Sequence, residues 1–350
     1  MIDFRYHLVS IVAVFLALAI GIVLGSTELQ GPAYNLLDKT TSKLQNELGQ
    51  VSSQRDAAQQ QAAEGEMYAQ SVEPAVLHGL LTGQRLLIVT EPGAQSSVVS
   101  GISSAALAAG ASITGQLNLA TKFFDTSGTT QDSLNQTTLD VAQAAGLQLD
   151  SSATYQQQAA EVIASEILAK ADASSTTGKP PVGQAIEAST VLQAYAASQF
   201  LSTTGQPANS ATLVVVVTPQ NPPADGSADQ LDQVLVPLVT ELAAKSSATV
   251  VVGSSAGSGA GSPIAVLRSN NVSSQVSTVD DADLVSGQTV AMQALAVGLA
   301  GGKAGSYGFT ANGASAIAPS PAPSPSASAS VTPTSSSSSS SSTTKKKVKK

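Results

Sequence analysis

The chain has 350 residues, a length that suits about two domains at ~150 residues each. It contains no cysteine, which excludes disulfides, thiolate metal sites and a cysteine nucleophile. Charged residues make up only 11% of the chain and the formal net charge is −8, so an acidic body gives no electrostatic basis for a nucleic-acid partner.

An apolar stretch near the start predicts a membrane-spanning helix. From Leu8 to Leu24 the sequence LVSIVAVFLALAIGIVL has Ser10 as its only polar side chain, and the next charge is Glu28. The uncharged stretch of twenty residues makes about 30 Å of helix, the thickness of a bilayer's hydrocarbon layer. A cleaved signal peptide is the alternative, but it would have a shorter apolar region and an A-x-A-like site, which LGSTELQGPA does not offer. We therefore expect a retained anchor over residues 1–27, with the lipid bilayer as its partner.

The charges that flank this anchor favour a cytoplasmic N-terminus. Arg5 precedes the apolar stretch, whereas the first charge beyond it is Glu28 and Lys39 comes later. Lys and Arg bias the orientation of a membrane helix toward the cytoplasm, and acidic residues contribute little. The bulk of the chain is therefore expected outside the cytoplasm.

Gly21 and Gly25 form a G-x-x-x-G pattern inside the anchor. This spacing places two bare backbone patches on one helix face and permits close pairing of membrane helices. The alternative is that the two glycines reflect the general frequency of glycine in membrane helices.

Residues 28–74 are predicted to form a coiled-coil stalk. Its helix runs from about Tyr34, after a turn at Gly31 and Pro32, to Glu73, and Pro74 ends it. Two interleaved series, each spaced by seven residues, are Leu37, Leu44, Val51, Ala58 and Gly65, and Tyr34, Thr41, Leu48, Arg55, Ala62 and Ala69. The first two heptads suit a coiled coil, and the later ones thin out to small residues. We expect a homo-oligomer through this stalk; the alternative is one amphipathic helix that packs on its own domain.

Residues 85–313 alternate short apolar runs with helical patterns, which predicts an α/β domain with a mainly parallel sheet. The predicted strands are 86–89, 113–119, 213–217, 249–252 and 276–279. The predicted helices are 98–109, 132–146, 155–171, 182–200, 229–245 and 287–299, and those between about 120 and 210 form an insertion rich in Ala, Ser and Gln.

Two loops fall where parallel sheets often hold ligands, beyond the carboxyl ends of strands: Thr90–Gly93 and Gly253–Gly261. The second, GSSAGSGAG, matches neither G-x-G-x-x-G nor a P-loop. We interpret it as a surface loop, and a small-ligand sensor that uses both loops is the weaker alternative.

Asp280, Asp281 and Asp283 cluster after the last predicted strand. Such carboxylates ligate hard cations such as Ca²⁺, but Asp283 is better placed to cap or precede the following helix. No Ser stands in G-x-S-x-G and two isolated His residues give no triad, so we expect no enzyme, no catalytic residue and no cofactor.

The end of the chain is glycine-rich from 301 to 313, where Tyr307 and Phe309 are expected to pack on the body. Residues 314–350 contain Ser/Pro repeats, eight consecutive Ser and the sequence KKKVKK. Such a segment has no means of burying a core, and we expect it to be disordered.

The N-terminal residues Asp3-Phe4-Arg5-Tyr6-His7, followed by VSIVAVFLALAIGIVLGS, resemble the opening of the actinobacterial copper transporter MctB family. The family shows an R-x-H element before such an anchor, then a coiled coil, an α/β body and a Y-G exit, so the resemblance spans about residues 1–313. The positions that match its motifs are Arg5, His7, Ser10, Phe15, Gly21, Gly25, Ser26, Tyr307 and Gly308.

The resemblance implies a role in copper efflux or homeostasis, through a pore-forming protein of the outer cell envelope. One predicted helix per chain cannot enclose a pore, so conduction would need an oligomer. Copper is a partner by resemblance only, because the soft and imidazole ligands that it prefers are few and scattered: Met1, Met67, Met292, His7 and His78. The alternative function is a structural or interaction protein of the envelope that presents an α/β module on a stalk, without transport activity.

Overall fold

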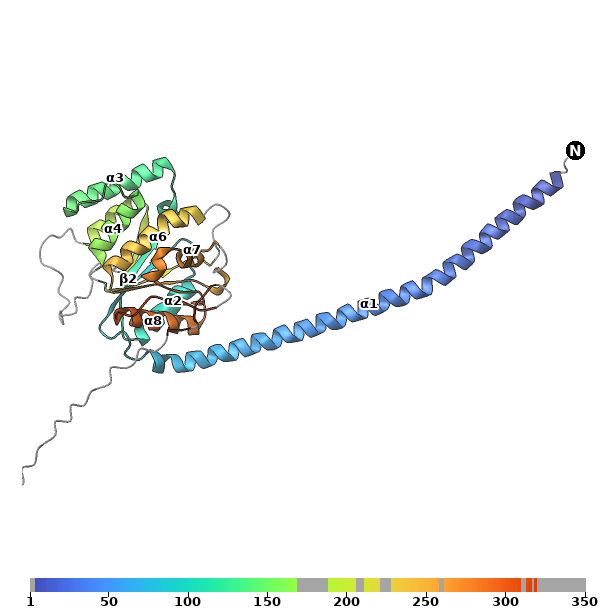
Figure 1. The fold of residues 1–350 in the computed structure, drawn as a ribbon, viewed down its shortest axis with the longest axis horizontal. Coiled ribbons are helices and arrows are strands. Elements are labelled where there is room, and N and C mark those ends of the chain that lie inside the picture. Colours follow the sequence, from blue (N-terminus) through green and yellow to red (C-terminus); the bar gives the residue numbers. More distant parts are fainter. Residues whose placement is uncertain are drawn as a thin grey trace, which may run out of the picture.

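The computed structural model describes residues 4–168, 188–205, 211–220, 228–257, 261–309, 313–316 and 318–319. It consists of one long helix, α1 (Phe4–Leu77), and an α/β body from which this helix projects (Figure 1). The predicted fold class is confirmed for the single N-terminal apolar helix and for the mainly parallel α/β domain.

The helix α1 is continuous over 74 residues. The predicted turn at Gly31 and Pro32 is therefore wrong. A proline removes only one backbone hydrogen bond, and the helix-favouring residues on both sides carry the helix through it. Pro74 does not end the helix either, because α1 runs on to Leu77 and the N–H of His78 still donates to the Pro74 carbonyl at 3.1 Å. Leu77 is fully buried in the body, and this packing holds the last turn in place.

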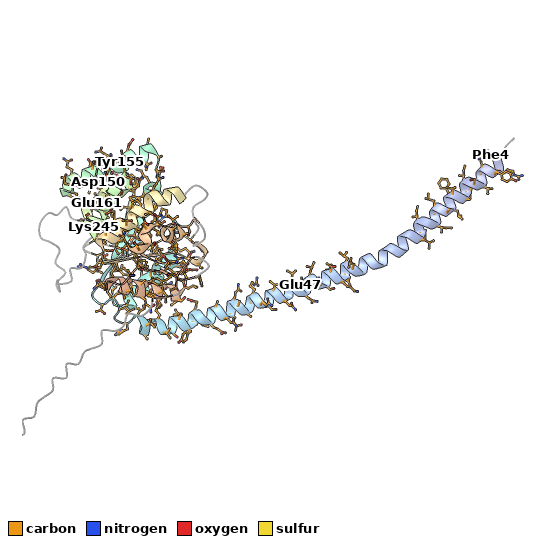
Figure 2. The ribbon with its side chains drawn as sticks, viewed as in Figure 1. Phe4, Glu47, Asp150, Tyr155, Glu161 and Lys245 are labelled. Atoms are coloured by element: carbon orange, nitrogen blue, oxygen red, sulfur yellow. The ribbon has the colours of Figure 1, made fainter. Side chains whose placement is uncertain are left out.

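Within the described residues, one segment is long and apolar enough to cross a membrane. It is Phe4–Gly25, with a mean hydropathy of 2.9 and none of its apolar window buried against protein. In Figure 2, Phe4 marks the far end of this segment and Glu47 lies midway along α1, both well away from the body.

Seven strands form one sheet in the order β3-β2-β1-β4-β5-β6-β7. They are β1 (Arg85–Thr90), β2 (Ser112–Leu119), β3 (Leu201–Gly205), β4 (Leu213–Val217), β5 (Ala248–Val252), β6 (Ser277–Val279) and β7 (Ser306–Tyr307). All neighbouring pairs are parallel except β2 and β3, which are antiparallel. Because β2 and β4 flank β1 on opposite sides, the strand order reverses between β1 and β4. This reversal is the place where open α/β sheets hold ligands.

Helices cover both faces of the sheet. They are α2 (Ser96–Ala108), α3 (Gly128–Ala145), α4 (Tyr155–Ile167), α5 (Ala188–Ala197), α6 (Ala228–Lys245), α7 (Pro263–Ser269) and α8 (Val285–Leu299). Figure 1 shows α3, α4, α6 and α7 on one side and α2 and α8 on the other. Successive residues of a strand point to opposite faces, so Leu87 and Val89 enter one core and Leu86 and Ile88 the other.

The five predicted strands are confirmed, but β3 and β7 were not predicted. Four of the five residues of β3 are exposed, so it carries no apolar alternation, and β7 has only two residues. The short helix α7 was also missed, since its seven residues are too few for a periodic signal.

Among the helices between 120 and 210, α4 and α5 end before their predicted ends, whereas α3 begins at Gly128, before its predicted start at 132. The helix α4 ends at Ile167 because Leu168 pairs with Ala211 as a parallel bridge. The helix α5 ends at Ala197, before Gln199 takes a φ of 61°. Residues 169–187, which include the predicted start of that helix, lie outside the described residues.

At the C-terminal end, Tyr307 packs on the body as predicted, with 7% of its surface exposed. Phe309 does not, since its side chain is 45% exposed. Ala316 forms a parallel bridge with Tyr307, so the chain still contacts the sheet there. Residues 320–350, most of the predicted disordered tail, lie outside the described residues.

Candidate functional site at the carboxyl edge of the sheet

The loops after β1 and β4 meet at the reversal of strand order. The N–H of Glu91 donates to the Val217 carbonyl at 3.0 Å. A Cβ atom on Gly93 would lie 3.3 Å from the Cβ of Pro219, and the Gln95 amide donates to the side-chain oxygen of Gln220. The two loops are therefore packed directly against each other.

The loop after β5 closes the same region. A Cβ atom on Gly257 would lie 2.4 Å from the carbonyl oxygen of Gln220 and 2.8 Å from that of Pro219, so only glycine fits there. These contacts tie the three loops together. A ligand sensor that uses Thr90–Gly93 and Gly253–Gly261 stays a prediction; residues 258–260 lie outside the described residues.

Glu91 is a buried acid at this edge of the sheet. Its side chain is 4% exposed, and Oε1 has no hydrogen-bond partner in the described part of the chain. Burial raises the pKa of Glu91 from 4.5 to about 8, because surroundings of low dielectric disfavour the carboxylate. The side chain is therefore mostly protonated at neutral pH. Sequence reasoning pointed to this loop but missed the residue, since nothing local distinguishes a buried Glu from an exposed one.

Asp280 and Arg268 form a buried ion pair. Arg268 Nη1 lies 2.8 Å from Asp280 Oδ2, and the two side chains are 8% and 0% exposed. The guanidinium also donates from Nε to Thr278 Oγ1 at 3.0 Å and from Nη2 to the Tyr307 carbonyl at 2.7 Å. Asp280 Oδ1 accepts the N–H of Phe309 at 2.8 Å. Through this ion pair and its hydrogen bonds, α7 is joined both to the end of β6 and to β7.

This ion pair accounts for the Tyr307-Gly308 motif. Gly308 has a φ of +115°, and a Cβ atom there would lie 1.8 Å from Asp280 Oδ1. Any other residue would be strained and would displace the buried carboxylate. In this structure the motif packs on Asp280 and Arg268. Six of the other matching positions are exposed along the first turns of α1: Arg5, His7, Ser10, Phe15, Gly21 and Gly25. Ser26 follows them on the same helix.

Asp283 precedes α8 as predicted, but its carboxylate does not cap this helix. It accepts both the N–H and the hydroxyl of Ser255, each at 2.8 Å, and so ties the loop after β6 to the loop after β5. The first turn of α8 is capped instead by Glu66 of α1. Its carboxylate accepts the N–H of Val285 at 2.7 Å and the hydroxyl of Ser286 at 3.0 Å.

Asp281 is the third carboxylate of the cluster. It is 6% exposed, and burial, reinforced by the charge of Asp280, raises its pKa to about 6.

Among the described residues, no group of three or more His, Cys, Asp or Glu side chains is placed to hold a metal ion, so the Ca²⁺ interpretation gains no support. The predicted soft ligands are also dispersed: Met67 is exposed on α1, while Met292 is buried in α8.

The chain matches the family described as "Copper transport outer membrane protein, MctB" over residues 1–319. Proteins named copper transporter MctB from Mycobacterium tuberculosis and Mycobacterium bovis are each 28% identical to it over 322 residues, which cover 91% of this chain and 99% of the relative. The protein of that name from Mycobacterium leprae is 27% identical over 323 residues, with the same coverage. The family match extends over α1 and the whole described sheet, and the chain therefore belongs to the MctB family.

Proposed function

We propose that this chain is a membrane-anchored protein of the cell envelope that takes part in copper transport. The observation that carries the proposal is the family match over residues 1–319, which includes the apolar helix and the body. The relatives that cover nearly the same length are named copper transporters. The segment Phe4–Gly25 supplies the anchor.

The proposed topology has a cytoplasmic N-terminus and an extracytoplasmic body. It is supported by Arg5, since Lys and Arg near a membrane helix favour the cytoplasmic side. Beyond Gly25, the 41 residues of α1 up to Glu66 measure about 60 Å at ~1.5 Å per residue. The body therefore stands far from the bilayer that holds the anchor. The family description as an outer membrane protein supports a position in the outer envelope.

We propose a homo-oligomer because one apolar helix has no interior through which copper can pass. Support comes from the stalk, whose Leu37, Leu44 and Leu48 are 63%, 54% and 68% exposed. The alternative, that the stalk packs on its own domain, holds only for the last turns of α1, since residues 36–65 are exposed throughout. A second α1 packed on the leucine face would cover it as a coiled coil.

The glycines of the anchor belong to a different face of the same helix. Because α1 is continuous, the angle between positions follows from about 100° per residue. Gly25 and Gly21 then lie about 120° and 160° around the helix from Leu37. We propose Gly21 and Gly25 as a packing face for a membrane helix other than the one that covers the leucine face.

Lysine at Leu44 and Leu48 together is expected to weaken self-association of the full chain at least a hundredfold, because an oligomer would bury two charges per helix. Light scattering after size-exclusion chromatography in detergent measures the change. Lysine at Ser42 and Asn46, which lie on the opposite side of the helix, adds the same charge and is expected to leave the oligomer intact. A monomeric unsubstituted chain would contradict the stalk proposal.

A strain that lacks this protein is expected to be inhibited by a several-fold lower copper concentration than its parent. It is also expected to accumulate more cell-associated copper, with zinc and manganese unchanged. Growth curves and elemental analysis of washed cells measure both effects. The full chain is expected to restore tolerance, whereas a chain with Leu16→Arg and Ile20→Arg, which disfavour membrane insertion, is not.

The second candidate is a structural or interaction protein of the envelope. The observation that favours it is the direct contact between the loops at the carboxyl edge, where Gly257 fits against Gln220. Unchanged copper tolerance with increased entry of a normally excluded dye would support this candidate and contradict the copper proposal.

A further inference from the structure

Two acidic side chains of the last turns of α1 face the body. Glu66 binds Val285 N–H and Ser286 hydroxyl at the first turn of α8, as described above. Seven residues on, Glu73 faces Thr289 of the same helix. The N-cap residue of α8 offers no side-chain hydrogen bond of its own, so Glu66 supplies the cap from a position 219 residues away in the sequence.

Asp281 lies against the same turn of α8. Its carbonyl accepts the N–H of Leu284 at 2.9 Å, and a Cβ atom on Gly287 would lie 2.6 Å from Asp281 Oδ1. Oδ1 is buried and has no hydrogen-bond partner among the described residues. The side chain of Asp281 is thus packed beside the turn that holds Glu66.

The charged groups that face Asp281 are all acidic. They are Asp280 and Asp283 from its own loop and Glu66 from α1. Arg268 neutralises Asp280, and Ser255 binds Asp283. Within the described residues, neither Asp281 nor Glu66 takes part in an ion pair. A charged Asp281 therefore repels Glu66, and a protonated Asp281 does not.

We propose that the docking of α1 on the body is linked to protonation of Asp281, so that mild acid tightens the junction and a higher pH loosens it. When α1 leaves, the charge of Glu66 moves away from Asp281, and this change favours the carboxylate. Where Asp281 titrates, the docked state therefore binds more protons than the undocked state. A fall in pH then shifts the equilibrium toward docking, as linkage requires. Burial and the neighbouring carboxylates raise the pKa of Asp281 to about 6, so the change falls just below neutral pH.

The contact between the last turns of α1 and α8, called the junction here, also determines how rigidly α1 holds the body. At low pH, α1 and the body behave as one rigid unit, because Glu66 and Leu77 both hold the last turns. At higher pH the body gains freedom to swing about the segment near Leu77, whose side chain stays buried in the core. The inference concerns this hinge alone and does not depend on copper transport.

Two spin labels on the full chain in detergent test the proposal, with the labelled chain diluted in an excess of unlabelled chain so that the proposed oligomer adds no distances between chains. The chain has no cysteine, so Gln59→Cys on α1 and Ala300→Cys after α8 give two labelled sites without background. We expect one narrow distance distribution at pH 5 and a second, broader population at pH 8. The ratio of docked to undocked molecules is expected to change about tenfold. A distribution that is the same at both pH values would overturn the proposal.

Substitutions identify the group that titrates. Asp281→Asn imitates the protonated side chain and is expected to keep the narrow distribution at both pH values. Asp132→Asn, an exposed aspartate on α3, is the matched control and should keep the full pH response. A pH response that survives Asp281→Asn would overturn the assignment.

Two variants of Glu66 keep the test independent of how well Asp281→Asn folds. Glu66→Ala removes the cap and is expected to give the broad distribution at every pH. Glu66→Gln keeps a hydrogen-bond acceptor and removes the repelling charge, so its pH response is expected to shrink and to move to lower pH. An unchanged pH response in Glu66→Gln would contradict the role of Glu66.

Discussion

Alanine at Arg268 is expected to lower the free energy of unfolding of the body by about 3–5 kcal/mol, because it leaves a buried charge without its partner. Asp280 is 0% exposed and has Arg268 as its salt-bridge partner at 2.8 Å. The same substitution removes the hydrogen bonds to Thr278 and to the Tyr307 carbonyl, which connect α7 to β6 and β7. Urea denaturation of the full chain in detergent at pH 7, followed by circular dichroism, measures the loss.

The chain contains a matched control for this effect. Arg55 and Asp56 on α1 form an ion pair at 2.7 Å, but their side chains are 64% and 61% exposed. Arg55→Ala is therefore expected to change stability by less than about 1 kcal/mol. Arg268→Met combined with Asp280→Leu removes both charges and should recover much of the loss. If Arg268→Ala cost no more than Arg55→Ala, the buried pair would not have the structural role assigned to it.

Glutamine at Glu91 is expected to stabilise the body at alkaline pH. The pKa of Glu91 is about 8 in the folded chain and near 4.5 when the group is solvated. Between these values the folded state holds a proton that the unfolded state releases, so the free energy of unfolding falls as pH rises. The fall is about 1.4 kcal/mol per pH unit, or roughly 5 kcal/mol over the whole interval. Glutamine does not titrate and avoids this loss.

Urea denaturation at pH 5, 7 and 8.5 measures the effect as the difference in the free energy of unfolding between Glu91→Gln and the unsubstituted chain. The stability of Glu91→Gln relative to the unsubstituted chain is expected to rise steadily across this range and to level off above pH 8. Asp140→Asn, an exposed residue of α3, should give a difference that does not vary with pH. Parallel stability curves for Glu91→Gln and the unsubstituted chain would show that Glu91 is ionised in the folded state.

The candidate site shows where sequence reasoning succeeds and where it fails. The loop Thr90–Gly93 and the aspartates after β6 were singled out from the sequence, because each follows a predicted strand. The prediction that the Asp283 carboxylate caps α8 failed, since a carboxylate from another part of the chain occupies that turn. Tyr307 and Gly308 were identified by family resemblance. The reason for the glycine, a carboxylate in the place of its Cβ atom, is visible only in three dimensions.

The sequence by itself determined those features of the structure that depend on residues close together in the chain. The anchor within Phe4–Gly25, the strand Leu213–Val217 and the mainly parallel α/β class depend on runs and periods of apolar side chains, which are local properties. The tertiary structure alone decided the sheet order, the edge strand β3 and the continuity of α1 through Pro32. It also decided the state of three acids: the protonation of Glu91, the pairing of Asp280 and the capping by Glu66. Each of these depends on contacts between residues that the fold brings together from distant parts of the chain.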